Sequence, residues 1–365
     1  MSTRIGIVGM PNAGKSSLFN ALTKAGAEAA NYPFTTIEPN VAVVPVRDRR
    51  MEEVAAVVGA SEIVWDTIDF HDIAGLVAGA HKGEGLGNKF LANIRDTDAI
   101  VHVVRAHRDE NVIHPEGEVD ELRDIETIEA ELVLADLEQA ERRVERVAKQ
   151  ARGGEKGAAA EEAWLREVIS ELQAGRPVRG VPVPDEAPHA ARDLGSLTAK
   201  PVLFVANVDE GSEEVPEAVA AHAAAQGARA VAVSSRIESE LSELDDEEAA
   251  AMRAELGAGG SGAETPLERV VQEAFALLDL LAFFTAGEDK PAQTWHLRRG
   301  LTVWHAAGEI HTDIQKGFVR AEVISSGELV DAGGYVAARE RGTLRTEGRD
   351  YVMADGDVIT VKFTP

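Results

Sequence analysis

A phosphate-binding loop is the strongest chemical signal in the sequence. Residues 9–16 read GMPNAGKS, which fits G-x-x-x-x-G-K-[ST] at every fixed position. The apolar run 4–8 before it predicts a buried strand, and residues 16–24 after it predict the start of an amphipathic helix. A strand, a glycine loop and a helix N-terminus form a cradle of backbone N–H groups for phosphates. The residues expected to contact a nucleotide here are Asn12, Ala13, Gly14, Lys15, Ser16 and Ser17.

Two side chains of this loop and a second motif have separate tasks. The Lys15 ammonium reaches the β- and γ-phosphates as a point charge, and the Ser16 hydroxyl is a ligand for Mg²⁺. Residues 72–75 read DIAG and end the strand predicted within 63–73. Asp72 is expected to hold Mg²⁺ through water, and the Gly75 backbone N–H is expected to bind the γ-phosphate.

A third metal ligand is expected in the polar segment 31–40. This segment contains Thr35 and Thr36, and a threonine there can close over the nucleotide and give its hydroxyl to Mg²⁺. We predict that Thr36 does so. The alternative interpretation is an exposed loop threonine without a role.

The motif expected to read the base departs from the usual pattern. GTPases present N-K-x-D after this strand, whereas residues 207–210 read NVDE, so Val208 replaces the lysine and Glu210 the aspartate. The extra methylene moves the carboxylate by about 1 Å, which spoils a bidentate hydrogen-bond pair with guanine. The sequence therefore favours ATP over GTP, with Asn207 and the Val208 backbone contacting the base. Asp209 is an alternative acid if the loop rearranges.

The residue that orients the attacking water is also unusual. Ras-like enzymes use a glutamine after D-x-x-G, but Leu76 stands there and can neither donate nor accept a hydrogen bond. The histidines that could replace it are His81, His102, His107 and His114. Of these, His102 falls inside the apolar run 99–104 and is expected in the core, whereas His114 lies in a predicted loop near the sheet. Asn12 offers a second route, in which it helps to bind a monovalent cation such as K⁺.

Composition and charge exclude several classes of function. The 365-residue chain carries a net charge of −26, which opposes direct binding to DNA and leaves RNA contacts to a local basic patch. It contains no cysteine, so disulfides and thiolate catalysis are excluded. It shows neither a secretory segment nor a long apolar run, so we expect a cytoplasmic protein that does not insert into membranes.

Beyond the motifs, strand-like and helix-like runs alternate, which predicts an α/β fold with a parallel sheet. Helical patterns over 124–150 and 158–173 predict an inserted hairpin, followed by a proline-rich connector 176–188. Basic residues cluster near the tip of the predicted hairpin: Arg142, Arg143, Arg146, Lys149, Arg152 and Lys156. They form either a solvated helix face or a local basic landing patch on an otherwise acidic protein. The last helix is predicted over 266–284, and a small α+β unit from about residue 286.

Together these motifs resemble the YchF/Obg-like ATPase family of P-loop proteins. The resemblance covers nearly the whole chain and includes residues 6–17, 31–40, 72–77, 82–88 and 308–313. It implies a P-loop nucleotidase core, a coiled-coil insertion and a C-terminal β-grasp TGS domain. It further implies a preference for ATP, a catalytic loop histidine that matches His114, and binding to the ribosome, chiefly its large subunit. The lack of cysteine would exclude any thiol-based regulation.

We therefore predict a P-loop domain over residues 1–284, with 124–188 as the inserted hairpin and connector, and a TGS domain over 285–365. The predicted function is Mg²⁺-dependent ATP hydrolysis as a conformational switch of a monomeric protein on the ribosome, with the 50S subunit and the 70S particle as partners. The alternatives are a GTPase of the same fold and a nucleotide-gated binding module whose hydrolysis is incidental.

Overall fold

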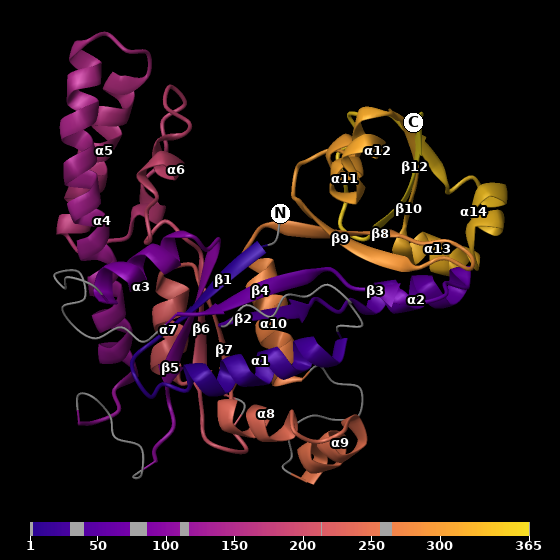
Figure 1. Ribbon diagram of the computed structural model, residues 1–365, viewed down its shortest axis with the longest axis horizontal. Helices are drawn as coiled ribbons and strands as arrows, with labels where there is room; N and C mark the ends of the chain where they lie inside the picture. Colours follow the sequence, from indigo (N-terminus) through magenta and orange to yellow (C-terminus); the bar gives the residue numbers. More distant parts are fainter. Residues whose placement is uncertain are drawn as a thin grey trace. The chain divides into compact units, whose positions relative to one another are not determined.

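The computed structural model describes residues 3–29, 40–73, 86–109, 117–212, 214–255 and 265–364. The chain divides into two compact units, which are Met1–Val44 with Asp69–Ala274, and Pro45–Ile68 with Phe275–Pro365. Each unit is built on its own six-stranded sheet (Figure 1). The predicted alternation of strands and helices is confirmed in the first unit.

The sheet of the first unit places the phosphate-loop strand in its middle. Its order is β2-β4-β1-β5-β6-β7, and β1, β5, β6 and β7 pair in parallel. The strands are β1 (Thr3–Val8), β2 (Val41–Pro45), β4 (Thr67–Asp72), β5 (Ala99–Arg105), β6 (Val202–Asn207) and β7 (Arg229–Val233). Every residue of β5 and β6 is buried, which requires cover on both faces of the sheet. Because parallel strands end at one edge, the loops after β1, β5 and β6 gather there.

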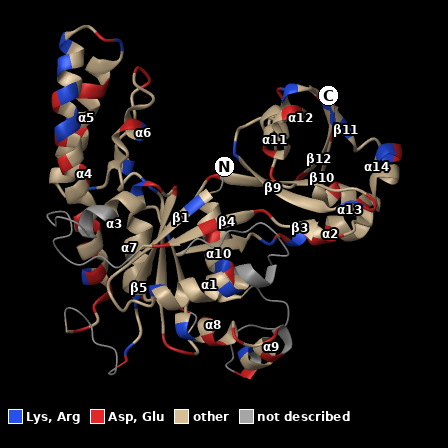
Figure 2. Cartoon of the chain, in the orientation of Figure 1, with Lys and Arg blue, Asp and Glu red and all other residues tan. Residues whose placement is uncertain are grey.

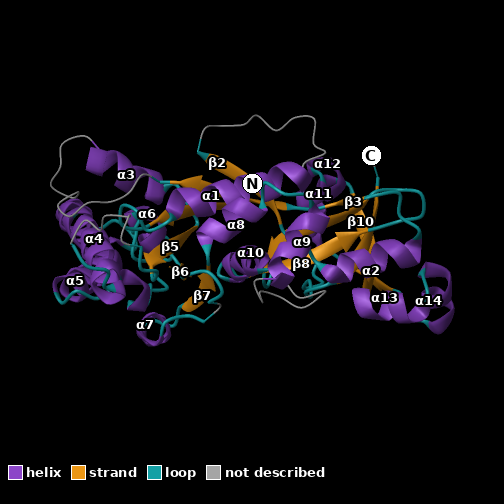
Figure 3. Cartoon of the chain, turned by 90° about the horizontal axis from the view of Figure 1, so that it is seen from below, coloured by secondary structure: helices purple, strands orange, loops and turns teal. Residues whose placement is uncertain are grey.

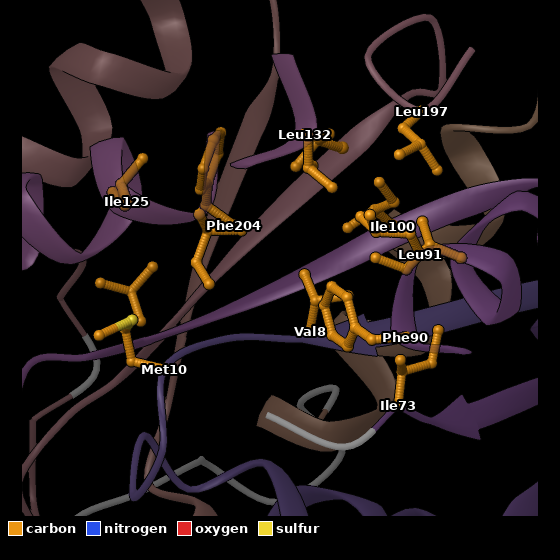
Figure 4. Close-up of a cluster of buried hydrophobic side chains, with 14 of the residues drawn as sticks. Val8, Met10, Ile73, Phe90, Leu91, Ile100, Ile125, Leu132, Leu197 and Phe204 are labelled. Atoms are coloured by element: carbon orange, nitrogen blue, oxygen red, sulfur yellow. The ribbon is translucent and has the colours of Figure 1, made fainter. Parts of the chain in front are cut away.

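Helices supply that cover. The helices of the first unit are α1 (Lys15–Ala29), α3 (Leu86–Arg95), α4 (Glu121–Arg152), α5 (Ala158–Gln173), α6 (Ala190–Leu194), α7 (Glu217–Ala225), α8 (Ser235–Leu241), α9 (Asp246–Glu255) and α10 (Pro266–Ala276), with a 3₁₀ turn at Val178–Gly180. One buried cluster joins β1, β5 and β6 to α3, α4 and α7 through residues such as Val8, Phe90, Ile125 and Phe204 (Figure 4). This cluster fixes the strands that carry the site.

The long helix α4 and its partner α5 pack side by side, joined by a short turn (Figures 1 and 3). They bury a cluster that includes Val147, Trp164 and Val168. Basic and acidic residues alternate along both helices (Figure 2). Arg143 bonds Glu161 at 2.5 Å and is only 18% exposed, so this arginine contributes to the packing of the two helices instead of to a surface patch.

The second unit forms a mixed sheet in the order β11-β10-β12-β8-β9-β3. Its strands are β3 (Ile63–Val64), β8 (Leu280–Thr285), β9 (Ala292–Arg298), β10 (Phe318–Ser325), β11 (Arg345–Glu347) and β12 (Asp357–Phe363). Its helices are α2 (Arg49–Val58), α11 (Val303–Ile310), α12 (Thr312–Lys316), α13 (Ser326–Ala332) and α14 (Tyr335–Arg341). Strand β8 pairs antiparallel with β9 and parallel with β12, so it is an interior strand.

The predicted helix 266–284 is wrong in its second half. Helix α10 ends at Ala276, and the turn through Asp279, with a φ of 50°, leads into β8. Successive β8 residues face opposite sides: Leu281 and Phe283 enter one core, and Phe284 enters the other. An apolar run buried on both faces carries no alternation, and this is why its strand character was missed.

Segment 45–68 was predicted to belong to the N-terminal domain, but it packs within the second unit. The strand predicted within 63–73 is β4, which joins the first sheet, and the same segment also contains β3, which pairs with β9 in the second sheet. Arg50 of α2 ties this segment down, since it pairs with Asp48 at 2.6 Å and with Asp355 at 2.8 Å, and lies over the ring of Phe284. The second unit therefore consists of the earlier segment Pro45–Ile68 and a C-terminal part, Phe275–Pro365. The C-terminal part begins ten residues before the predicted boundary at 285.

In the described part of the chain, no helix combines the length and the apolar character that crossing a bilayer would require.

Candidate functional site

The glycines of the loop after β1 are required by close backbone contacts. Gly9 has a φ of 155°, and a Cβ atom there would lie 2.3 Å from the Val103 carbonyl oxygen. Gly14 has a φ of 99°, and its Cβ would lie 2.1 Å from the Asn207 amide nitrogen. Asn12 also adopts a left-handed φ, of 62°. These conformations fold the loop tightly around the N-terminus of α1 and turn backbone N–H groups toward a phosphate.

Lys15 is held beneath this loop. Its Nζ donates to the carbonyl oxygens of Gly9, at 3.0 Å, and Met10, at 2.8 Å, and the side chain is 7% exposed. Burial lowers the pKa of Lys15 to about 8, against the opposing attraction of Asp72. A buried ammonium held only by neutral carbonyls gains strongly from an anion, so a phosphate would draw it out of this arrangement.

Asp72, for which the sequence predicts a role in metal binding, is the last residue of β4. Its Oδ1 is buried and has no hydrogen-bond partner among the described residues, and burial raises its pKa while Lys15 opposes the shift. Such an unsatisfied acceptor fits the water shell of Mg²⁺. Ser16 is exposed at the start of α1 and free to approach a ligand. In the described ranges no three acidic or histidine side chains form a metal cage, as expected where phosphates supply most ligands.

Asn207 acts as a clamp between three loops. Its Nδ2 donates to the Ala13 carbonyl at 3.0 Å, and its Oδ1 accepts from the Ser235 backbone N–H at 2.9 Å. The side chain is 4% exposed. It therefore ties the phosphate loop to the end of β6 and to the turn between β7 and α8. One N–H of its amide remains for a ligand.

The residues after Asn207 do not form the lysine–carboxylate pair typical of guanine sites. The Val208 side chain is 5% exposed and packs with Ala206 and Ala232, while its N–H donates to the Val233 carbonyl at 3.0 Å. Glu210 is 44% exposed, and its carboxylate lies 2.5 Å from the Arg236 guanidinium. Only the Val208 carbonyl is thus left for a backbone contact with the base.

The two described candidate histidines differ. His102 lies inside β5, is 3% exposed and has its pKa lowered to about 3 by burial, next by His222 and then by Lys15. It is a neutral core residue, as the sequence predicted. His107 follows β5, and burial, followed by the charge of Arg105, lowers its pKa. The predicted residues Thr36, Gly75, His81 and His114 lie outside the described residues.

Two arginines at this edge were missed by sequence reasoning. Arg105 is 2% exposed and donates to the carbonyls of His107, at 3.4 Å, and Asp109, at 3.2 Å, so it anchors the segment that leads toward residue 114. Arg236 pairs with Glu210. Arg236 could have been found, because residues 234–236 directly follow the strand after β6 and must reach the same edge. Arg105 could not have been found in this way, because a single arginine at the end of an apolar strand shows no pattern that marks it as buried.

Comparisons with known proteins show which family this chain resembles. Residues 4–140 match a family model described as a 50S ribosome-binding GTPase, and residues 280–364 match the YchF-GTPase C-terminal family model, described as a protein of unknown function. The chain is 48% identical to a Haemophilus influenzae protein named ribosome-binding ATPase YchF, and the alignment covers all of this chain and 99% of that protein. It is 44% identical, over both full lengths, to the Bacillus subtilis protein of the same name. The solved structure of the Schizosaccharomyces pombe YchF GTPase has a TM-score of 0.86 at 33% identity and covers 99% of this chain and 98% of that one.

Proposed function

Because this chain belongs to the YchF family, with the α/β fold of P-loop GTPases, we propose that it is an ATPase that works on the ribosome as a nucleotide-driven conformational switch. The observation that carries the nucleotide site is the buried Lys15 under the glycine loop, beside the unpaired carboxylate oxygen of Asp72. The Lys15 ammonium would meet a negatively charged phosphate oxygen, and the Asp72 carboxylate would meet Mg²⁺ through a water molecule.

The metal would be held by hydroxyl and water ligands together with phosphate oxygens. Ser16 and Thr36 supply the hydroxyls, and Asp72 binds through water. When bound, Mg²⁺ offsets the negative charge that develops on the phosphates during hydrolysis. The loop amides of residues 12–17 and Gly75 bind the phosphates. Asn12 could add a monovalent cation such as K⁺.

The preference for ATP follows from what surrounds Asn207. The remaining Asn207 N–H and the Val208 carbonyl contact the base, while Glu210 pairs with Arg236. We expect ATP to bind at least about tenfold more tightly than GTP, since the Glu210 carboxylate at the position of the guanine-reading acid is paired with Arg236. Calorimetric titration of both nucleotides against the purified chain checks this. Tighter binding of GTP would favour the rival proposal, a GTPase of the same fold.

A second measurement tests the contribution of Glu210 to the choice between ATP and GTP. Glu210→Asp shortens the side chain that meets Arg236 and restores the residue type of guanine sites, so GTP affinity should rise relative to ATP. Glu240→Asp is the matched control, because Glu240 bonds the same arginine at 3.2 Å from the adjacent turn of α8. Equal shifts in both variants would assign the effect to Arg236 instead of the base.

His114 is proposed to position the attacking water or to stabilise the transition state. Arg105 anchors His107 and Asp109, which precede His114 in the chain at this edge of the sheet. We expect His114→Ala to keep ATP affinity but lower turnover by about 10²–10⁴-fold. Steady-state hydrolysis with calorimetric binding checks both parts. The exposed His189 gives the control His189→Ala, and hydrolysis by His114→Ala at the wild-type rate would refute the role.

The ribosome, through its 50S subunit and in the 70S particle, is the proposed partner of a cytoplasmic monomer. The relatives' names support ribosome binding. Residues 285–365 are proposed as the TGS domain and residues 124–188 as the coiled-coil insertion, and either could carry the contact. A nucleotide-gated module with incidental hydrolysis is the rival from another class. Sedimentation of the His114→Ala variant with ribosomes distinguishes the switch from the module. If this variant still binds and releases ribosomes according to the nucleotide present, the result would favour the module.

A further inference from the structure

A cavity of about 410 Å³ lies in the first unit. It is enclosed by strands β1, β5 and β6, helix α4, the connector after α5 and the end of α7. Its apolar lining includes Val8, Ile100, Leu132, Leu197 and Val202, of which all but Val202 are labelled in Figure 4. Its volume is within the range of small-molecule sites. No residue of the phosphate loop 9–16 lines it.

One part of the cavity wall is polar and carries two opposite charges. Glu129 of α4 accepts a hydrogen bond from the Gln226 amide nitrogen at 2.7 Å, and this nitrogen also lies 2.7 Å from His222 Nε2, which is 3.1 Å from the Glu129 carboxylate. The Gln226 amide oxygen in turn accepts from Arg179 at 3.0 Å. Glu129, Arg179 and Gln226 all line the cavity. An acid and a base are therefore held close together there, bridged by one neutral amide.

The Arg179 guanidinium is incompletely satisfied. Besides Gln226 it donates only to the Lys200 carbonyl at 3.4 Å, and its Nε is buried without a hydrogen-bond partner in the described ranges. It makes no ion pair within 4.0 Å with any described carboxylate; the neighbouring Arg176, in contrast, is paired with Glu171. Burial lowers the pKa of Arg179, with Glu129 opposing the shift. A half-buried cation with an unused donor points to a ligand that carries an anion.

The hydrogen bonds of Gln226 indicate which charged groups that ligand should carry. Its amide presents a donor to the acid and an acceptor to the base, which are the roles that an ammonium and a carboxylate on one carbon would fill more strongly. Beyond it, one part of the wall is aliphatic, and another part carries the ion pair of Arg176 with Glu171. We propose that this cavity binds a free α-amino acid with an apolar side chain, whose ammonium meets Glu129, whose carboxylate meets Arg179, and whose side chain enters the apolar part.

The rival occupants are excluded by the same groups. A purely apolar ligand would leave Arg179 Nε unsatisfied, and an apolar monoanion would bring a second negative charge close to the Glu129 carboxylate. His102, which also lines the cavity, is neutral at every physiological pH and adds no charge. The site therefore discriminates by its pair of charges, a property that analogues lacking either charge can test.

The probe is L-phenylalanine, titrated by calorimetry into the full-length protein without nucleotide. We expect saturable binding with one site. Binding should weaken by about tenfold or more for 3-phenylpropanoate, which lacks the ammonium, and for phenethylamine, which lacks the carboxylate. Equal affinity for 3-phenylpropanoate would overturn the zwitterion assignment in favour of a simple anion site. No heat or saturable spectral change at millimolar phenylalanine would overturn the proposal altogether.

Variants tie the binding to the cavity. Arg179→Gln and Glu129→Gln should each weaken phenylalanine binding by about tenfold or more. The matched controls are Arg166→Gln and Glu162→Gln, which break an ion pair of 2.6 Å on α5 and do not line this cavity. Ala225→Trp, at an exposed position on the lining, should block entry with all charges retained, and it replaces any charge variant that fails to fold. Loss of binding in the controls, or retention in Ala225→Trp, would contradict the assignment.

Discussion

Replacing Lys15 with alanine is expected to lower the rate of ATP hydrolysis by about 10²–10³-fold, the range seen when one preorganised donor to a developing oxyanion is removed. Lys15 is buried, with only two carbonyl partners, so its ammonium is available to the phosphates. The control is Lys24→Ala in the same helix, whose ammonium pairs with Glu243 at the surface. Hydrolysis that stays near the wild-type rate would show that the loop amides alone suffice.

The same lysine predicts a pH dependence of ATP binding. Burial lowers its pKa to about 8 in the free protein, and contact with phosphates favours the charged form in the complex. Binding therefore takes up a proton above pH 8: affinity is complete below that pH and falls about tenfold per unit as the pH rises beyond it. Titrations between pH 7.5 and 9.5 test this, and the Lys15→Ala variant should show no such fall. A flat wild-type profile would contradict the assignment.

Asn207→Ala is expected to destabilise the first unit by about 2–4 kcal/mol and to weaken ATP binding at least tenfold. It removes both clamp bonds and leaves the Ser235 N–H and the Ala13 carbonyl without those partners. Ser235 is 0% and Ala13 1% exposed, and each buried unsatisfied group costs about 1–3 kcal/mol. Urea unfolding and calorimetry measure the two effects.

Asn207→Asp separates the two halves of the clamp. A carboxylate still accepts from Ser235 but cannot donate to the Ala13 carbonyl, which it repels. We expect much of the stability to return while ATP binding stays weak, because the phosphate loop alone is released. The exposed Asn20 on α1 provides the control Asn20→Ala. If Asn207→Ala altered neither quantity, Asn207 would not be a clamp.

The sequence by itself determined the parts whose physics is local. The spacing of Gly9, Gly14 and Lys15 fixes a strand, a tight turn and a helix start, and the apolar runs around them predicted β1, β5 and β6. The pattern also identified Asp72 and Asn207 as polar residues at strand ends. Even the extent of α5 was predicted correctly, because a helix repeats a short-range period.

Only the tertiary structure decided which distant segments meet. Strand β3 pairs with β9 more than 200 residues away, and Arg50 reaches Asp355, so residues 45–68 join the second unit although nothing in their own pattern requires it. The sequence predicted that Asn207 contacts the base, whereas its bonds to Ala13 and Ser235 came from the fold. Local periodicity reports which face of an element is buried; it does not carry the identity of the partner across the chain, because that is selected by the packing of the whole core.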